Sequence, residues 1–387
     1  MASGAASVDA PTIFVSIPSY RDPECQYTVT DVFRKAKHPG RLRIGICWQT
    51  DREEDAACFR LDLSEHQERI RTVFLHHSQA RGPCYARALI QRQLFQGEDF
   101  YFQLDSHFRM IEHWDEELIL QLSWCPSQKP ILTTYPSSYT LPDDYSPGGV
   151  DRAQVNADTH PVVMCARELG TDGFLRTTGK RVLAERLGGS PASGLFWAAG
   201  FAFSRGSVVE EVPYDASLED LFFGEEQSMA ARLWTAGWDF YAPTKVIGYH
   251  LWTRRHRPVF REHACDSQRL REANSQAAVR WLLGCADAQP ESGTGGATNQ
   301  EAPAGSPEPS CCVVCPGRLG LGTARTLAEY EAFCGVSMPR GKITLRARRG
   351  GVKFDAFVDG DPVAQAMATP SAASTAALGV AGALPIL

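Results

Sequence analysis

The chain has 387 residues, of which 43% are hydrophobic and 22% are charged, and its formal net charge at pH 7 is −6. This composition is typical of a soluble globular protein with room for one large domain and appendages, or for two modest domains. The acidic balance argues against a nucleic-acid-binding protein, and no apolar window is long enough to span a membrane.

The N-terminal segment and the cysteines indicate a reducing compartment. Residues 1–10 show neither the basic nor the apolar part of a secretory signal, so we expect a cytoplasmic protein. Of the twelve cysteines, Cys25 and Cys47 lie in apolar-periodic segments, where a free thiol acts as a small hydrophobic group. The group Cys311-Cys312-Cys315 has no second pair at zinc spacing, so we expect no structural zinc.

Apolar runs and helical patterns alternate along the chain. Residues 12–17 form a β-branched and aromatic run suited to a buried strand, and Asp22, as N-cap before Pro23, predicts a helix that Gly40 ends. Further strands are predicted at 42–48, 71–76, 100–104 and 131–135, and further helices at 87–95, 114–122, 225–236 and 268–283. The last of these helices carries an apolar stripe expected to be buried, formed by Leu270, Ala273, Ala277 and Trp281.

This alternation predicts an α/β fold with a doubly wound, mostly parallel sheet. Residues 140–194 have weak periodicity and many Asp, Gly and Pro residues, so they are expected to be loop-rich. The expected organisation is a flexible N-terminus (1–10), a main domain (11–284), a disordered low-complexity insertion (285–310), a C-terminal extension (311–361) and a flexible Ala-rich tail (362–387). Within the extension, Thr326 and Glu329 form a capping box that opens a helix.

Asp105 and His107 follow the apolar run 100–104, two residues apart. Residues i and i+2 of a strand point to the same face, so a carboxylate and an imidazole can converge on one ion. Because open α/β sheets bind ligands at the carboxyl ends of their strands, a divalent metal that holds a phosphorylated substrate is the hypothesis to test. The alternative is an ordinary solvated loop.

Two further loops carry arginines next to predicted strands or helices. Ser19-Tyr20-Arg21 comes directly after the first strand, a usual nucleotide-contacting position in doubly wound folds. Arg81 and Arg87 bracket the turn at Gly82, at the start of a helix whose amides favour anions. Neither loop matches a P-loop, and a solvated basic turn is an equal alternative for the second.

Adjacent carboxylates open a later helix. Glu225 and Glu226 follow two phenylalanines and a glycine, so they are either favourable first-turn charges or acids that accept hydrogen bonds from sugar hydroxyls. Farther on, His250 stands beside Trp252 and offers a second imidazole. A lone histidine is usually structural, and His250 matters because Asp105 and His107 lack a third protein ligand.

Taken in order, these motifs resemble one family, the cytosolic-type N-acetylglucosaminyltransferases that modify hydroxyproline on the ubiquitin-ligase adaptor Skp1. The Asp-x-His motif is also similar to that of the polypeptide GalNAc-transferases. The residues that carry the resemblance are 13–21 (IFVSIPSYR), 80–83 with 86–87, 102–107 (FQLDSH) with 114–115, 198–204 (AAGFAFS), 223–226 with Met229, 237–243 (GWDFYAP), His250 and 325–335 (RTLAEYEAFCG).

The resemblance implies a GT-A fold and a retaining transfer of GlcNAc from UDP-GlcNAc to a hydroxyl of a cytosolic protein, with Skp1 as the best single candidate. It implies that Asp105, His107 and His250 hold Mn²⁺ or another divalent cation. It further implies catalytic or sugar-contacting roles for Glu225 and Glu226, acceptor-side roles for Trp252 and Trp197, and donor binding by Ser19, Tyr20, Arg21, Arg81, Gly82, Arg87, Asp105 and Gly200.

Two alternatives stay open. One is a non-catalytic module that binds a nucleotide sugar. The other is a transferase of the same class with another UDP-sugar or a small acceptor.

Overall fold

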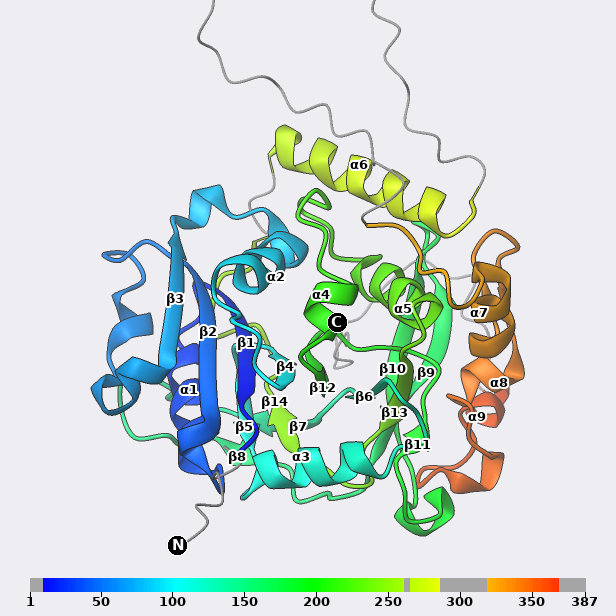
Figure 1. Ribbon diagram of the computed structural model, residues 1–387, viewed down its shortest axis with the longest axis horizontal. Helices are drawn as coiled ribbons and strands as arrows, with labels where there is room; N and C mark the ends of the chain where they lie inside the picture. Colours follow the sequence, from blue (N-terminus) through cyan, green and yellow to red (C-terminus); the bar gives the residue numbers. More distant parts are fainter. Residues whose placement is uncertain (1–9, 261–264, 286–318, 369–387) are drawn as a thin grey trace, which may run out of the picture.

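The computed structural model describes residues 10–260, 265–285 and 319–368 (Figure 1). Its centre is an eight-stranded sheet in the order β11-β13-β6-β12-β4-β1-β2-β3. These strands are β1 (Ile13–Tyr20), β2 (Leu42–Gln49), β3 (Ile70–Leu75), β4 (Phe100–Leu104), β6 (Pro130–Thr133), β11 (Ala192–Ser193), β12 (Phe201–Arg205) and β13 (Asp239–Ala242).

The pairing of this sheet is mostly parallel. β1 runs parallel to β2 and β4, β2 to β3, and β6 to β13. β12 lies antiparallel between β4 and β6, and β11 is antiparallel to β13. The predicted α/β fold with a mostly parallel sheet is confirmed.

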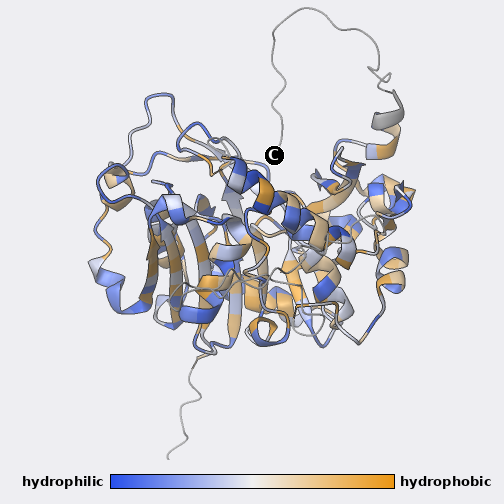
Figure 2. Cartoon of the chain, turned by 90° about the horizontal axis from the view of Figure 1, so that it is seen from above, coloured by the Kyte–Doolittle hydropathy of each residue, from blue (hydrophilic) through white to orange (hydrophobic). Residues whose placement is uncertain are grey.

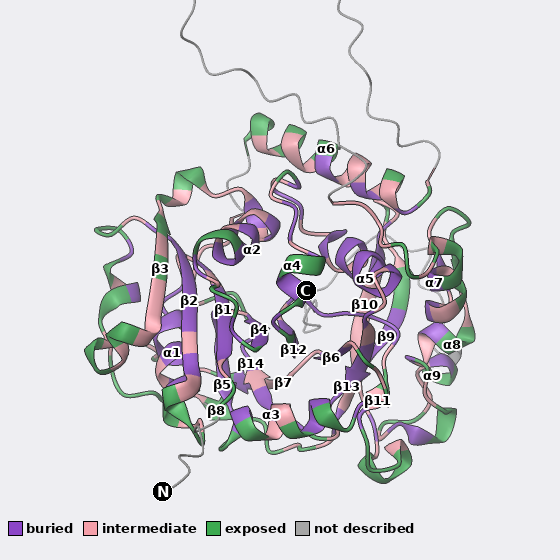
Figure 3. Cartoon of the chain, viewed as in Figure 1, coloured by how far each residue is buried: buried purple, intermediate pink, exposed green. Residues whose placement is uncertain are grey.

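Helices cover both faces of the sheet. They are α1 (Cys25–Arg34), α2 (Gly82–Gln93), α3 (Trp114–Ser123), α4 (Val208–Glu211) and α5 (Glu225–Thr235). Successive side chains of a strand point to opposite faces, so Ile13 of β1 packs in one core with α1 and α3, and Phe14 packs in the other with α2 and α5. Apolar residues accordingly concentrate in the central strands and buried helix faces, while the outer loops are polar and exposed (Figures 2 and 3).

A second, four-stranded sheet has the order β5-β14-β7-β8. Its strands are β5 (Phe108–Met110), β7 (Ser137–Thr140), β8 (Gln154–Val155) and β14 (Gly248–His250). β14 pairs antiparallel with β5 and parallel with β7. This sheet joins the chain just after β4 to a segment about 140 residues later, as the register His250↔Phe108 shows.

The prediction that residues 140–194 are loop-rich is wrong in part. β9 (Val162–Leu169) and β10 (Leu175–Arg181) form an antiparallel hairpin, and Val163, Met164 and Cys165 of β9 are buried. The two strands obtain their order from pairing with each other and from packing on the core, which the periodicity of either strand alone does not show.

The C-terminal part contains α6 (Asp266–Leu282), α7 (Leu327–Cys334), β15 (Val336–Ser337), β16 (Lys342–Ile343), α8 (Leu345–Arg348) and α9 (Pro362–Ala368). The capping box is confirmed: the Thr326 hydroxyl accepts from the Glu329 amide, and the Glu329 carboxylate accepts from the Thr326 amide. α7 packs on α5, where Trp234 stacks on Phe333 with ring centroids 5.2 Å apart. The extension therefore folds against the main domain.

Three boundary predictions need correction or stay open. α1 begins at Cys25 after Glu24 as N-cap, and it ends at Arg34, well before Gly40. The tail is not flexible throughout, since α9 covers 362–368, and Arg349 pairs with Asp361 directly before it. The insertion expected at 285–310 lies outside the described residues except for its first one, as do Cys311, Cys312, Cys315 and the rest of the tail.

The predicted buried face of α6 is also wrong. Leu270 and Trp281 are 62% and 42% exposed, and the buried residues of this helix are Ser275 and Val279. The Ser275 hydroxyl donates to the Glu219 carbonyl at 2.7 Å, and Arg271 pairs with Asp220 at 2.7 Å. These polar contacts face the core, so the apolar stripe with Leu270 and Trp281 is left exposed. Figure 3 shows that much of α6 is exposed or only partly buried.

None of the helices in the described part of the chain combines the length and the apolar character that crossing a membrane requires.

Candidate metal and donor site

The topology of the large sheet brings two loops together. β2 and β3 lie on one side of β1 in the sheet, and β4 lies on its other side. The connection after β1 therefore runs toward one edge of the sheet, and the connection after β4 runs toward the opposite edge. A crevice at such a switch point is the usual ligand site of an open α/β sheet. Here the carboxyl end of β1, through Pro18 and Tyr20, and the loop after β4 border a cleft of about 270 Å³.

Asp105, His107 and His250 meet at this cleft. Their ligand atoms all lie within 4.8 Å of one another, with Asp105 Oδ2 3.2 Å from His250 Nε2. The β14–β5 pairing places His250 beside the loop that holds the other two residues, and the Leu251 amide donates to the His107 carbonyl. One carboxylate and two imidazoles form a donor set that suits Mn²⁺ and other divalent transition metals. The residues present therefore fit such a cation.

The electrostatics of this trio also suit a metal, which needs a neutral imidazole and an ionised carboxylate as ligands. Burial and the neighbouring His250 lower the pKa of His107 to about 3, so its ring is neutral at pH 7. For Asp105, burial favours the protonated form, but the hydrogen bond with His250 and the charge of Arg87 outweigh it and hold the pKa well below its usual range.

Arg87 of α2 ties Asp105 to the opposite wall of the cleft. Its Nη2 donates to Asp105 Oδ1 at 2.9 Å, and its Nε donates to Glu225 Oε1 at 3.1 Å. The third nitrogen, Nη1, is buried without a protein partner among the described residues. Burial opposes the charge of this arginine, yet Tyr214, Glu225 and Asp105 around it raise its pKa.

Glu225 and Glu226 enter from the first turn of α5, after Gly224 in a left-handed conformation. The Tyr214 hydroxyl donates to Glu225 Oε1 at 2.9 Å, beside the contact with Arg87. None of the described lysines, arginines or histidines forms an ion pair with Glu226, which accepts from the Tyr135 hydroxyl at 2.6 Å and from the Ala199 amide at 2.9 Å. Burial raises the pKa of Glu226 to about 7, so this carboxyl titrates near neutral pH.

Gly200 is required by the close approach of Asp105. A Cβ at this position would lie 2.6 Å from Asp105 Oδ2, and the Gly200 carbonyl accepts from the Asp105 amide. Any side chain would therefore displace the carboxylate from its place beside His250.

Ten of the residues singled out from the sequence line the cleft: Tyr20, Gly82, Arg87, Asp105, His107, Gly200, Glu225, Glu226, His250 and Trp252. Ser19, Arg21, Arg81 and Trp197 are not among the described lining residues. Their parts in donor or acceptor binding stay predictions.

The surroundings of these four residues explain their positions. The Arg21 guanidinium pairs with Glu54 and Asp55, because the parallel β1–β2 pairing sets the two loops side by side. Ser19 is fully buried, and Arg81 Nε lies 3.8 Å from Glu219. Trp197 borders a separate cavity of about 40 Å³, bounded on its other side by α7.

Asp22 lies beside the proposed metal ligands, which the sequence did not indicate. It is not the N-cap of α1, although its Oδ1 accepts from the Glu24 amide. Its fully buried carboxylate contacts His107, His256 and Arg257. These partners are distant in sequence, and Asp before Pro is an ordinary helix-start pattern, so no local signal separates this role from capping.

The sequence and the structure of this chain were compared with those of known proteins, and the matches are glycosyltransferases. A family described as Glycosyltransferase (GlcNAc) matches residues 12–68 and 60–340. No curated protein sequence matches the chain. The structure of GalNAc-T7 with UDP, GalNAc and Mn²⁺ has a TM-score of 0.50 and 11% identity, over 71% of this chain and 48% of that chain. The chain thus spans about half the length of that structure.

Two other solved structures are less similar. S. aureus TarS in complex with UDP-GlcNAc has a TM-score of 0.40 and 12% identity, over 70% of this chain and 67% of that chain. The mannosyltransferase PcManGT from Pyrobaculum calidifontis, with GDP-Man and Mn²⁺, has a TM-score of 0.41 and 10% identity, over 70% and 64% of the two chains. At such identities the likeness to GalNAc-T7 shows the fold alone, which is the GT-A glycosyltransferase fold.

Proposed function

The chain belongs to the glycosyltransferase (GlcNAc) family, and from that premise we propose that it transfers GlcNAc from UDP-GlcNAc to a protein hydroxyl with the help of a divalent cation such as Mn²⁺. The observation that carries the proposal is the convergence of Asp105, His107 and His250 in the cleft at the switch point of the sheet. A cation held there would act as a Lewis acid toward the negative charge that develops on the departing diphosphate.

The residues around the trio suit the rest of the donor. Within the described part of the chain, Arg87 Nη1 is a buried donor without a protein partner, and a phosphate or sugar oxygen would satisfy it. Glu225 and Glu226 lie where they can accept hydrogen bonds from sugar hydroxyls. Tyr20 and Trp252 supply aromatic surface in the same cleft.

We propose a retaining transfer that gives an α-linked sugar. In such a reaction the oxygen of the departing diphosphate can accept the proton of the attacking hydroxyl on the same face of the sugar. No separate general base is then needed, and we assign none.

The acceptor part of the proposal rests on the sequence resemblance. It names a hydroxyproline of a cytoplasmic protein, with Skp1 as the first candidate, and it places Trp252 at the acceptor end of the cleft. The Trp252 ring lies next to the His250 ring, with centroids 4.2 Å apart and planes tilted by 49°, so an acceptor beside it would lie close to the proposed cation.

The first test is hydrolysis of UDP-GlcNAc, UDP-GalNAc, UDP-Glc and UDP-Gal by the purified protein with Mn²⁺, with and without a hydroxyproline-containing Skp1 peptide. We expect UDP-GlcNAc to be preferred and EDTA to abolish turnover. Asp105→Ala should lower the rate at least about a hundredfold, because it removes a metal ligand. Asp62→Ala, which changes an exposed carboxylate outside the cleft, is the matched control.

The outcomes separate the alternatives. Full activity of Asp105→Ala or full activity in EDTA would refute the metal assignment. Preference for another UDP-sugar would refute the donor assignment. UDP binding without hydrolysis or transfer would indicate a non-catalytic nucleotide-sugar-binding module.

A further inference from the structure

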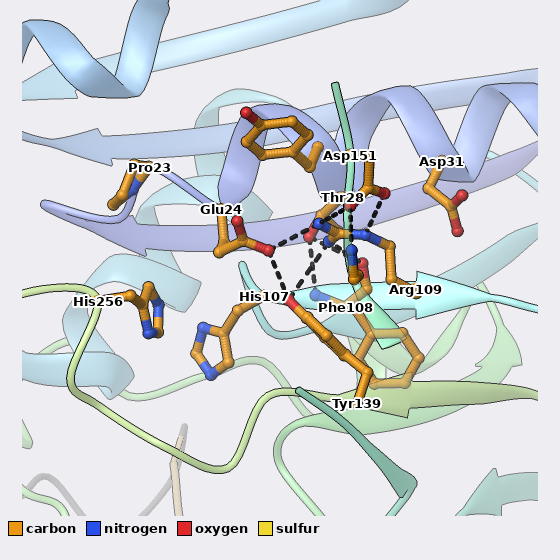
Figure 4. A network of polar contacts seen from close by, with 12 residues as sticks. Pro23, Glu24, Thr28, Asp31, His107, Phe108, Arg109, Tyr139, Asp151 and His256 are labelled. Atoms are coloured by element: carbon orange, nitrogen blue, oxygen red, sulfur yellow. Dashed lines mark hydrogen bonds and ion pairs between the residues drawn. The ribbon is translucent and has the colours of Figure 1, made fainter. Parts of the chain in front are cut away.

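Asp22 is a fully buried carboxylate at the edge of the proposed metal site, in the loop between β1 and α1. Its Oδ2 lies 2.8 Å from His107 Nδ1 and accepts from the Ser106 hydroxyl at 2.6 Å, and its Oδ1 lies 3.1 Å from His256 Nε2. The rings of His107 and His256 face this loop from two different segments of the chain, with centroids 5.8 Å apart (Figure 4).

We propose that Asp22 is a positioning residue for His107, a role that rests on the metal site of the proposed function. An ionised carboxylate can only accept a hydrogen bond, so the nitrogen of His107 that faces it must carry the proton. The proton therefore sits on Nδ1, and Nε2 is left as the nitrogen with a free lone pair. Such a carboxylate partner sets the tautomer and the orientation of a metal-binding imidazole.

The same carboxylate could instead be read as part of a second cation site, since Asp22, His107 and His256 also have ligand atoms within 4.8 Å of one another. The charge of Arg257 decides against it. Its Nε lies 3.3 Å from Asp22 Oδ2, so a permanent cation already occupies the place beside this carboxylate and would repel a metal ion. One imidazole nitrogen of His107 is moreover already used by Asp22.

Asp22 also joins three segments around the cleft. Its contacts reach the loop after β4 through Ser106 and His107, and the segment after β14 through His256 and Arg257. Arg257 itself lines the cleft. The carboxylate thus holds the ligand loop and one cleft wall to the same point.

Glu24 offers a matched control two residues away. It is also fully buried, but it contacts Arg109, Tyr139 and Tyr145 and no proposed metal ligand (Figure 4). The experiment compares the full-length wild type with Asp22→Asn, Asp22→Ala and Glu24→Gln. Mn²⁺ affinity is measured by electron paramagnetic resonance of the free ion, unfolding free energy by urea titration, and the His107 tautomer of the metal-free protein by ¹⁵N NMR.

We expect Asp22→Ala to weaken Mn²⁺ binding about 10- to 100-fold, the usual effect of removing a partner of a metal-binding histidine. Asp22→Asn should weaken it less, because the amide oxygen can still accept from His107 Nδ1–H. The wild-type ring should be protonated at Nδ1, and Asp22→Ala should populate both tautomers. Glu24→Gln should lower stability and leave Mn²⁺ affinity within about twofold.

The proposal is overturned if Asp22→Ala keeps the wild-type Mn²⁺ affinity, or if its His107 tautomer is unchanged. It is also overturned if Glu24→Gln weakens Mn²⁺ binding as much as Asp22→Ala, since both would then act through general destabilisation. A wild type that binds no Mn²⁺ would refute the metal assignment itself, and a wild type that binds Mn²⁺ but hydrolyses no donor would refute only the proposed activity.

Discussion

Asp22 and Glu24 lie two residues apart in one short loop, and both carboxylates are fully buried, yet they belong to two different networks. Asp22 points to the cleft side and meets His107, His256 and Arg257. Glu24 points to the four-stranded sheet and accepts from Arg109 at 2.7 Å and from Tyr139 at 2.7 Å (Figure 4). We call the first the cleft network and the second the anchor network.

The two networks differ in whether their polar atoms are satisfied by protein. In the anchor network, Arg109 donates to Glu24, Asp151 and the Phe108 carbonyl, which closes a bridge between α1, β5 and the segment after β7. In the cleft network, His256 Nδ1 and Arg257 Nε are buried without a hydrogen-bond partner among the described residues. A buried charge therefore does not by itself mark a binding site; open donors and acceptors beside a cleft do.

The largest predicted effect is on the anchor network. Arg109→Met should lower the unfolding free energy by about 3–5 kcal/mol, because it leaves Glu24 as a buried charge without a cation. Urea denaturation measures it. Arg152→Met, which breaks the exposed pair with Asp144 in the same region, is the control and should cost less than about 1 kcal/mol. If the two variants lower the unfolding free energy equally, the buried ion pairs of the anchor network contribute no more to stability than an exposed pair does.

The second prediction concerns Glu226, a cleft carboxyl that forms no ion pair with any of the residues that the structure describes. Its pKa is raised from 4.5 to about 7, so the folded state holds the proton more tightly than the unfolded state. The stability from this group is therefore fully present below pH 4.5 and is lost as pH rises toward 7, by up to about 3 kcal/mol.

Urea denaturation of the wild type and of Glu226→Gln between pH 5 and about pH 8 tests this. The unfolding free energy of the wild type should fall relative to that of the variant across that window, because the carboxyl of Glu226 ionises as pH rises and the amide of Glu226→Gln does not. Parallel curves would mean that Glu226 titrates normally and that the cleft tolerates its charge.

The smallest predicted effect sharpens the role of Asp22 within the cleft network. Ser106→Ala removes one hydrogen bond to Asp22 but leaves the contact between Asp22 and His107, so it should cost about 1 kcal/mol of stability. Mn²⁺ affinity, measured by the same resonance titration, should fall less than fivefold, about the equivalent of that loss. A loss as large as that of Asp22→Ala would shift the positioning role to Ser106, whose oxygen lies 3.2 Å from His107 Nδ1.

Much of the candidate site could be predicted because its residues stand at the ends of recognisable elements. Asp105 follows a mostly apolar run, Arg87 lies in the helix that the Gly82-Pro83 turn opens, and Glu225 begins a helix after Gly224. The sequence next to each of these residues predicts the strand or helix that holds it, and each residue lines the cleft. For Arg21 the sequence predicted a place near the donor, but the Arg21 side chain pairs with Glu54 and Asp55. These two acids lie in the loop after the next strand, and the sequence around Arg21 does not indicate this pairing.

The amino-acid sequence by itself determined the alternation of strands and helices, the capping box at Thr326 and the presence of a carboxylate and an imidazole at the end of β4. These features follow from hydrophobic period and from hydrogen bonds between near neighbours. The tertiary structure alone decided that His250 reaches the pair through the β14–β5 register, that α6 turns its apolar stripe outward, and that Asp22 faces His107 while Glu24 faces Arg109. The physical reason is that periodicity reports which side of an element is apolar, whereas the surface that covers this side and the partner that a buried charge meets are set by elements far away in the chain.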